Sequence, residues 1–297
     1  MSFSVDIAFV NAYKSNIAIK FQQMGSRLRP YVRTESQNAE FSFYDRIGPT
    51  EAVEMVGRHA DTPMIGTDHD RRRIGLRDFN WADLIDKKDK ARMLADPTSA
   101  YTMNAIYAMG RKMDRVIIEA AFGTSYSGKQ GETSITLPSS QIIGSTYVES
   151  GGAVASNLTI GKLRRARYLF GKAEADNEGE SDLVAVIDPS QTQSLLRTTE
   201  VTSDDYNTVK ALVGGSIDTF MGFKFIRSNL LPVAGTVRDC LFFEKQGLCL
   251  AVNAEVDVDV GPRRDKNNTN QVYVEAHFNA TRMWEEKVIK VQCDEAA

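Results

Sequence analysis

Cysteine, an excess of positive charge and long apolar runs are all scarce or missing in this chain of 297 residues. Cys240, Cys249 and Cys293 form no C-x-x-C pair, so the sequence predicts neither a disulfide framework nor a zinc ribbon, and we interpret them as ordinary thiols. The 36 Lys and Arg residues against 39 Asp and Glu leave a net charge of −3. A dedicated duplex-DNA binder would need a basic excess, so any contact with nucleic acid is expected to be weak and local.

No stretch approaches the roughly 18 apolar residues of a membrane span, so we expect no membrane partner. Residues 1–9 lack the basic and apolar regions of a secretory signal, which indicates a protein made and used in a cytoplasm. The apolar share of 42% and charged share of 25% are typical of globular proteins. At this length we expect one large α+β body with extensions, or two intimately connected domains.

The chain opens with a segment that has helical periodicity. Apolar residues recur at steps of three and four from Val10 to Leu28, which predicts an amphipathic helix that Pro30 ends. The segment is locally positive, because Asp6 is opposed by Lys14, Lys20, Arg27, Arg29 and Arg33. Both an extended arm and a solvated helix face of a domain fit this charge pattern.

A strand and then an unusually polar segment follow. Phe41, Phe43 and Ile47 alternate with polar residues at the period of a strand, which Gly48-Pro49 ends. Residues 57–77 then carry ten charged or titratable side chains: Arg58, His59, Asp61, Asp68, His69, Asp70, Arg71, Arg72, Arg73 and Arg77. With few apolar residues to bury, this segment is expected to project as a long loop or hairpin that becomes ordered against a partner.

The strongest helix signal begins at Asp96, which fits the N-cap position, with Pro97 at the first helical position. Gly123 fits the left-handed position beyond the end. About 26 residues would span about 39 Å, which is longer than the average globular helix and suggests a spine for other layers. Asp114 is placed off the apolar stripe, which comprises Tyr101, Ala105, Ala108, Met109, Met113, Val116, Ile117, Ala120 and Ala121.

The second half of the chain predicts a compact α/β part and terminal strands. A helix over 158–175 is followed by a buried strand over 183–187, and Asp188-Pro189 repeats the cap chemistry of the long helix. Further strands are indicated by 223–225, 241–243 and 248–252, and by clean alternation in 256–260 and 272–278. The last two are interpreted as long hairpin strands with one solvated face. We find no internal repeat.

Two alternatives for specific chemistry are weak. Gly123, Gly128 and Lys129 match most of the phosphate-binding pattern G-x-x-x-x-G-K-[ST]. However, Gln130 replaces the Ser or Thr that binds magnesium, and the segment follows a helix, so we favour a flexible loop. The residues that could ligate a metal are crowded by four arginines, which favours an exposed loop; they are His59, Asp61, Asp68, His69 and Asp70.

Nothing in the sequence pairs a nucleophile with a base. His277 lies in an alternating strand and is interpreted as a sheet-face residue. We therefore expect no enzyme, no catalytic or metal-binding residue and no cofactor.

Three stretches carry a family resemblance: Asp96-Pro97-Thr98-Ser99-Ala100-Tyr101 leading to residues 109–114, residues 199–206 (TEVTSDDY), and residues 220–223 (FMGF) leading to 228–232 (SNLLP). Their order, and the order of the larger parts, resembles that of tailed-bacteriophage major capsid proteins. The resemblance covers nearly the whole chain and implies an α+β Hong Kong 97-type capsid fold. It assigns an N-terminal arm to 1–40, an extended loop to 41–80, a peripheral domain with a long spine helix to 81–157, an axial α/β domain to 158–252 and peripheral return strands to 253–297.

The resemblance implies a major capsid (head) protein that self-assembles through hexamers and pentamers into an icosahedral shell around double-stranded DNA. The alternatives are a subunit of an encapsulin-like cellular compartment with the same fold, or an unrelated soluble enzyme. Partners would be further copies of the chain, a separate scaffolding protein, a portal protein and, as an option, a decoration protein. Because the arm begins almost at Met1, we expect no fused scaffold. The shell would be assembled in the cytoplasm of a bacterial host and become the virion capsid.

On this resemblance, residues 1–33 pack against an adjacent capsomer and residues 57–77 lie over a neighbouring subunit. Each exposed ion pair contributes only about 0–1 kcal/mol, so strength comes from repetition. The expected contacts between subunits are Lys14, Phe21, Arg27, Arg29, Arg58, Asp61, Asp68, Asp70, Arg71, Arg72, Arg73 and Arg77.

Overall fold

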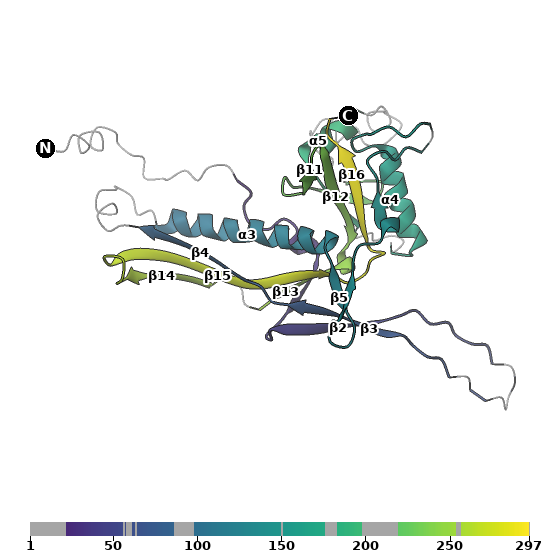
Figure 1. Ribbon diagram of the computed structural model, residues 1–297, viewed down its shortest axis with the longest axis horizontal. Coiled ribbons are helices and arrows are strands. Elements are labelled where there is room, and N and C mark those ends of the chain that lie inside the picture. Colours follow the sequence, from purple (N-terminus) through teal and green to yellow (C-terminus); the bar gives the residue numbers. More distant parts are fainter. Residues whose placement is uncertain are drawn as a thin grey trace. The chain divides into compact units, whose positions relative to one another are not determined.

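The computed structural model in Figure 1 describes residues 22–55, 57, 61–62, 64–85, 98–149, 151–175, 183–197, 219–253 and 257–296. The chain divides into two compact units. The first comprises Met1–Ser26, Arg77–Met113 and Ala254–Phe278, and the second comprises Arg27–Leu76, Asp114–Asn253 and Asn279–Ala297. In the described residues, no helix is long and apolar enough to cross a membrane.

The first unit is built around a long antiparallel strand. Strand β15 (Thr269–Arg282) pairs with β14 (Asp257–Arg263) and with β4 (Asp78–Ile85). The alternation predicted for 272–278 is confirmed, because every second side chain is buried: Val272, Val274, Ala276 and Phe278. His277 lies on the other sheet face, as predicted, with Nδ1 2.7 Å from Asp78 Oδ1.

The predicted spine helix is confirmed as α3 (Thr98–Phe122), 25 residues long. Residues 96 and 97 lie outside the described residues. At the other end, the prediction for Gly123 is wrong, because its backbone is not left-handed. Its N–H instead continues the helical pattern by donating to Glu119 O at 2.8 Å, and a Cβ there would lie only 2.7 Å from that oxygen. Close approach of the backbone, and not a positive φ, therefore requires glycine.

The helical stripe predicted through Leu28 is also wrong in its described part, since residues 22–28 form no helix. Gly25 has a φ of +71°, which breaks the helical path. Residues 10–21, which carry the rest of that stripe, lie outside the described residues.

The second unit contains a seven-stranded sheet. Its strands, in spatial order, are β7 (Ile142–Ile143), β16 (Val288–Asp294), β12 (Val237–Glu244), β8 (Leu183–Ile187), β10 (Phe223–Arg227) and β9 (Thr219–Phe220), with β11 (Val233–Ala234) beside β12. All five residues of β8 are buried, as the continuous apolar run predicts. This sheet forms the core of the unit.

Two helices accompany this sheet and confirm the predicted strand–helix unit. Helix α4 (Ile160–Lys172) begins after Thr159, whose side chain caps it. Helix α5 (Pro189–Leu196) follows Asp188, which forms a capping box with Gln191, as the Asp-Pro signal predicted. Figure 1 shows α4 alongside β16. Its Phe170 ring packs 6.0 Å from Phe223 of β10, centroid to centroid.

A smaller four-stranded sheet joins distant segments of the second unit. It consists of β2 (Phe41–Ile47), β3 (His69–Gly75), β5 (Ser125–Ser127) and β6 (Thr133–Ile135), in that order. Strands β1 (Arg33–Ser36) and β13 (Leu248–Val252) pair in parallel and belong to the same sheet as β15. The remaining elements are the 3-10 turns η1 (Arg29–Tyr31), η2 (Ser139–Gln141) and η3 (Lys245–Gly247).

The flexible loop expected after the spine helix is instead the hairpin β5–β6. Gly128 and Gly131 adopt positive φ values of 102° and 75° in its turn, which explains the glycines without a phosphate ligand. The backbone N–H of Gln130 donates to the Glu132 carboxylate at 2.8 Å. This turn therefore holds a carboxylate of its own chain where the phosphate pattern would place an anion.

The three cysteines are free and fully buried in the second unit. Burial raises the pKa of the Cys249 thiol to about 12. The hydrogen bond with Cys293, together with burial, raises the pKa of Cys240. The thiols therefore pack as apolar side chains.

A fully buried lysine, missed in the sequence, joins three segments around α4. Lys162 Nζ donates to the carbonyl oxygens of Ser145 (3.0 Å), Ser156 (2.6 Å), Asn157 (3.1 Å) and Gln292 (3.0 Å). Burial lowers the pKa of Lys162, and the charge of nearby Asp294 opposes part of that shift. This ammonium fixes the chain before α4 to strand β16.

Replacing Lys162 by Met is expected to lower the free energy of unfolding by about 3 kcal/mol, because buried carbonyl oxygens lose their donor. Chemical denaturation of unassembled subunits measures the change. Lys172→Met, at an exposed position of the same helix, is the control and is expected to change stability by about 0.5 kcal/mol or less. Equal effects of both substitutions would contradict the assigned role.

Candidate assembly site

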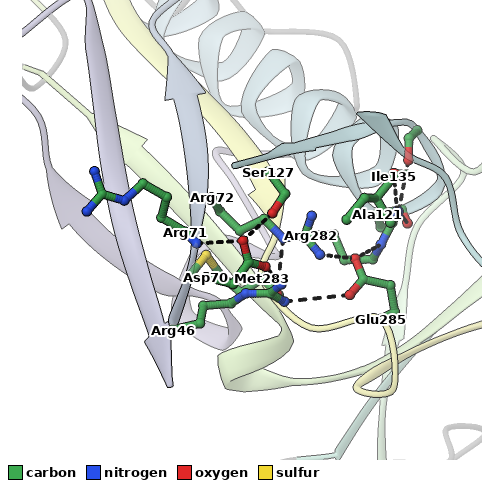
Figure 2. Close-up of polar contacts among 11 residues, drawn as sticks. Arg46, Asp70, Arg71, Arg72, Ala121, Ser127, Ile135, Arg282, Met283 and Glu285 are labelled. Atoms are coloured by element: carbon green, nitrogen blue, oxygen red, sulfur yellow. Dashed lines mark hydrogen bonds and ion pairs between the residues drawn. The ribbon is translucent and has the colours of Figure 1, made fainter. Parts of the chain in front are cut away.

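A cluster of buried charges anchors the β2–β3 hairpin to the rest of the second unit (Figure 2). Arg72 of β3 is fully buried and pairs with Glu285, in the turn between β15 and β16. Arg46 of β2 pairs with Asp70 of the opposite strand, and its Nη1 also lies 3.6 Å from Glu285. Both arginines donate to the carbonyl oxygen of Met283. The polar segment that was predicted to project therefore includes strand β3, whose residues are held in place by these ion pairs.

The same carboxylate serves a third arginine. Arg282 is fully buried, and its Nε lies 3.6 Å from Glu285 Oε1. Its two Nη atoms donate to the carbonyl oxygens of Ala121 and Gly123, both at 2.8 Å, and of Ile135 at 3.0 Å. Burial lowers the pKa of both Arg72 and Arg282. Glu285 therefore compensates two buried positive charges that tie the hairpin, the end of α3 and β6 together.

Asp70 adds a second acidic centre. Partial burial alone would raise its pKa, but hydrogen bonds from the Ser127 hydroxyl, Arg46 and the backbone N–H of Arg71 outweigh burial and hold the pKa at about 2. Asp70 is therefore ionised at every pH at which the protein is ordinarily handled.

The two faces of the hairpin sheet differ in character. On the inner face, Ile74 packs in a small core with Cys249, Ala251 and Met283. On the outer face, the register aligns Phe43 with Arg73 and Arg73 with Tyr126. We call this the outer hairpin face, defined by Phe41, Phe43, Ile47, Arg71, Arg73 and Tyr126.

The outer hairpin face leaves large apolar side chains in solvent. Phe41, Phe43, Ile47 and Tyr126 are all at least 40% exposed. Arg73 and Arg71 cover them in part, with their Cζ atoms 4.1 Å from the Phe41 ring centroid and 5.7 Å from that of Phe43. Two exposed apolar side chains also lie in the connection between the strands, where Met55 is 77% exposed and Met64 is fully exposed. Several large exposed apolar side chains in one hairpin are typical of an interaction site.

Residues 25–28 are held by contacts with α3. In the first unit, Gly110 meets the backbone of Gly25 so closely that a Cβ would lie 2.5 Å from Gly25 Cα. In the second unit, the buried carboxylate of Asp114 accepts the backbone N–H groups of Arg27 at 3.0 Å and Leu28 at 3.1 Å. Asp114, placed off the apolar stripe in the sequence, is therefore a buried anchor for the chain leaving this segment.

A family model for phage capsid proteins matches residues 5–295. The chain belongs to this family. Among curated proteins, no match is found.

Solved capsid structures share the fold of this capsid protein. The capsid of Cyanophage P-SCSP1u is 17% identical, with a TM-score of 0.71 over 96% of this chain and 93% of that chain. The capsid of Helicobacter pylori bacteriophage KHP30 is 9% identical, with a TM-score of 0.71 over 99% and 98%. The capsid of Cyanophage Pam1 is 14% identical, with a TM-score of 0.69 over 100% of this chain and 99% of that chain.

These similarities confirm the predicted Hong Kong 97-type α+β fold and the resemblance to tailed-phage capsid proteins. They favour the phage capsid interpretation over an encapsulin-like compartment and over an unrelated enzyme. The family gives the protein a structural role in the capsid of the virion, as a subunit of an oligomeric shell.

The predicted contact residues of this capsid protein fall into three groups. Lys14, Phe21 and Arg58 lie outside the described residues. The exposed group comprises Arg27, Arg29, Asp61, Asp68 and Arg77. The remaining group lies in β3 and is partly or fully buried; it comprises Asp70, Arg71, Arg72 and Arg73.

Several of these predicted contact residues already have partners in their own chain. Arg72 is committed to Glu285, and Arg71 Nε lies 3.1 Å from Asp45 Oδ1. Arg27 donates to the carbonyl oxygen of Arg227 at 2.7 Å. The fully buried Arg72 is therefore unavailable to a neighbouring subunit in this conformation.

The metal alternative finds no support in the described part of the chain, where no group of three or more ligand-type side chains converges. Asp61, Asp68 and His69 are exposed there, and His59 lies outside it. The sequence missed Glu285, Arg282 and Asp114, since only partners distant in the chain distinguish these residues from ordinary surface charges.

Replacing Glu285 by Gln is expected to destabilise the unassembled subunit by about 3–5 kcal/mol, because Arg72 and Arg282 would keep their buried charges without a counter-charge. Urea denaturation followed by circular dichroism measures the loss. In the control Glu35→Gln, which breaks the exposed pair with Arg33, the change is expected to stay below about 1 kcal/mol. A loss of under 1 kcal/mol in Glu285→Gln would show that the cluster does not anchor the hairpin.

The low pKa of Asp70 predicts that the free energy of unfolding decreases at acidic pH. Because its pKa in the folded protein is about 2, below the ordinary value of 3.8, its contribution is complete above about pH 4 and is lost as the pH falls toward 2. The variant Asp70→Asn should therefore be less stable than the wild type at pH 6, with a smaller difference at pH 2. Denaturant midpoints at several pH values test this, with Asp45→Asn as the control for an exposed carboxylate of the same hairpin. A difference that does not shrink in acid would contradict the assignment.

Proposed function

We propose that this capsid protein is the major head protein of a tailed phage, assembling through hexamers and pentamers into an icosahedral shell around double-stranded DNA. The observation that carries the proposal is the exposed apolar surface of the β2–β3 hairpin, set on a base of buried charges. A side chain such as Met64 gains nothing from full exposure in an isolated subunit. It gains about 1.5–3 kcal/mol when a neighbour covers it.

The anchoring cluster supports this role in a second way. A projecting hairpin that moved freely would lose conformational entropy whenever it docked, and that loss would weaken the contact. The buried pairs of Arg72 and Arg46 hold the base of the hairpin before assembly. The subunit is thus prepared for association.

We extend the proposal to the parts of the chain. Residues 1–40 act as the arm, 41–80 as the extended loop, 81–157 and 253–297 as the peripheral domain, and 158–252 as the axial domain. The exposed residues of the predicted contact set, such as Asp61, Asp68 and Arg77, pair across subunits. Subunits are assembled in the host cytoplasm with a separate scaffolding protein and a portal, and the protein catalyses no reaction.

The hairpin surface can be tested by placing charge on it. The variant Met55→Glu/Met64→Glu changes two highly exposed side chains, so the subunit should fold normally. In a shell these carboxylates would lie in an apolar contact, and the yield of shells should fall at least about tenfold. Electron microscopy and sedimentation of the expressed protein measure this yield.

The control is Val154→Glu, at a side chain that is 67% exposed and lies outside the hairpin. Circular dichroism of the unassembled subunits shows whether each variant folds. Wild-type assembly of the hairpin variant would overturn the role of the hairpin. Wild-type protein that forms only monomers or small oligomers under all assembly conditions would overturn the shell itself.

A further inference from the structure

Helix α4 carries a surface of one charge sign in a chain that is acidic overall. Its 13 residues, IGKLRRARYLFGK, include five bases and no acidic residue. One of these bases, Lys162, is buried and committed to backbone carbonyl oxygens. Arg164 and Lys172 are exposed, as is Tyr168, whose side chain is 56% exposed. These three residues recur at steps of four and therefore line one face of the helix.

The exposed stripe and the packed face of α4 are distinct. The packed face buries Ile160, Leu163, Ala166 and Phe170. On the stripe, the guanidinium carbon of Arg165 lies 5.2 Å from the Tyr168 ring centroid, which orders both side chains at the surface. From residue 164 to 172 the stripe is about 12 Å long. We call it the α4 basic face, defined by Arg164, Arg165, Tyr168 and Lys172.

Little of this charge is neutralised by the residues that the structure describes. Glu149 accepts from Arg164 Nη1 at 3.1 Å, and both side chains are more than 40% exposed, so the pair is weak. In the part of the chain that the structure describes, neither Arg165 nor Lys172 has an acidic partner. Lys172 lies in the last turn of α4, where its positive charge interacts favourably with the helix dipole. Arg164 and Arg165 lie in earlier turns and lack this stabilisation.

We propose that the α4 basic face binds the phosphate backbone of duplex DNA inside the shell. Three flexible or stacked cations beside a tyrosine hydroxyl suit phosphate oxygens, which offer the same contacts whatever the base sequence. With a net charge of −3 on the whole chain, such a local face supplies a weak, sequence-independent contact. The inference rests on the proposed function, because the shell brings DNA to the subunit.

The composition of the face favours a nucleic acid over an acidic protein segment. A protein interface of this size would contain an apolar centre, and charged residues would be depleted there. On the α4 basic face, Tyr168 is the one aromatic residue and cations surround it. The face lacks the mixed signs that fix the register of two protein surfaces.

The test compares the wild type with Arg164→Gln/Arg165→Gln/Lys172→Gln as full-length, unassembled subunits. Fluorescence anisotropy with a labelled duplex of mixed sequence gives the affinity at 50 and 200 mM salt. Each lost phosphate contact lowers the slope of log affinity against log salt by about 0.9, so we expect the slope to fall by two to three, with at least about tenfold weaker binding at 50 mM salt. The control Arg263→Gln/Arg264→Gln/Lys266→Gln removes the same charge from exposed residues around the β14–β15 turn and should retain most of the affinity.

Two further measurements separate this inference from the proposed function. Electron microscopy should show that the α4 variant forms shells as the wild type does, whereas loss of shells would make the face a contact between subunits and overturn the inference. A poly-glutamate peptide of equal charge should compete poorly with DNA, and equal competition would indicate an acidic protein partner and overturn it. Unchanged DNA affinity in the α4 variant would also overturn it, even where shells form normally. Absence of shells in the wild type would count against the proposed function alone.

Discussion

The burial of Glu285 between two arginines is the constraint on which the hairpin depends. Arg72 and Arg282 are fully buried, and a buried guanidinium needs a counter-charge to offset its desolvation. One carboxylate provides the charge, and carbonyl oxygens at the end of α3 and in β6 accept hydrogen bonds from the two Nη atoms of Arg282. An apolar core could hold the same strands, but it would tolerate small shifts. Directional hydrogen bonds fix the geometry of the hairpin base more narrowly.

That polar base allows the rest of the hairpin to stay exposed. Assembly needs surface that is apolar enough to associate, and folding needs that surface to leave the core. In this protein the small core under the inner hairpin face is formed by Ile74, Cys249, Ala251 and Met283, while the phenylalanines of β2 face outward under partial cover of arginine side chains. The two requirements are met on opposite faces of one sheet.

The periodicity of apolar residues predicted the helices and strands whose formation depends on the local sequence. The spine helix, the buried strand over 183–187, its cap at Asp188 and the alternating strand over 272–278 were foreseen, because 3.6-residue and two-residue periods record burial directly. The single solvated face predicted for 256–260 was wrong, since Val258 and Val260 of β14 are also exposed. The order of these parts was enough to indicate the family. The hairpin base was not foreseen, since Arg72 and Glu285 are separated by 213 positions and each resembles a surface residue in its own segment.

Contacts with distant parts of the chain also explain why the burial of Asp114 and Lys162 was not predicted. Both are charged residues on amphipathic helices, where the pattern places them in solvent, and both are fully buried because backbone groups of remote segments require them. The prediction for Gly123 failed for a different reason. Glycine after a helix is usually explained by a left-handed backbone, but here the backbone of α3 continues and steric room alone selects the residue.

The buried thiols have a practical consequence. Thiolates, and not thiols, react with maleimides and similar reagents, and burial keeps Cys240 and Cys249 protonated, while Cys293 is fully enclosed. A cysteine introduced at an exposed position would therefore be the one readily alkylated site in the described part of the chain. Since every subunit of a shell would carry it, a single substitution would display a chemical handle across the whole particle surface or its lumen, at a spacing set by the capsid lattice.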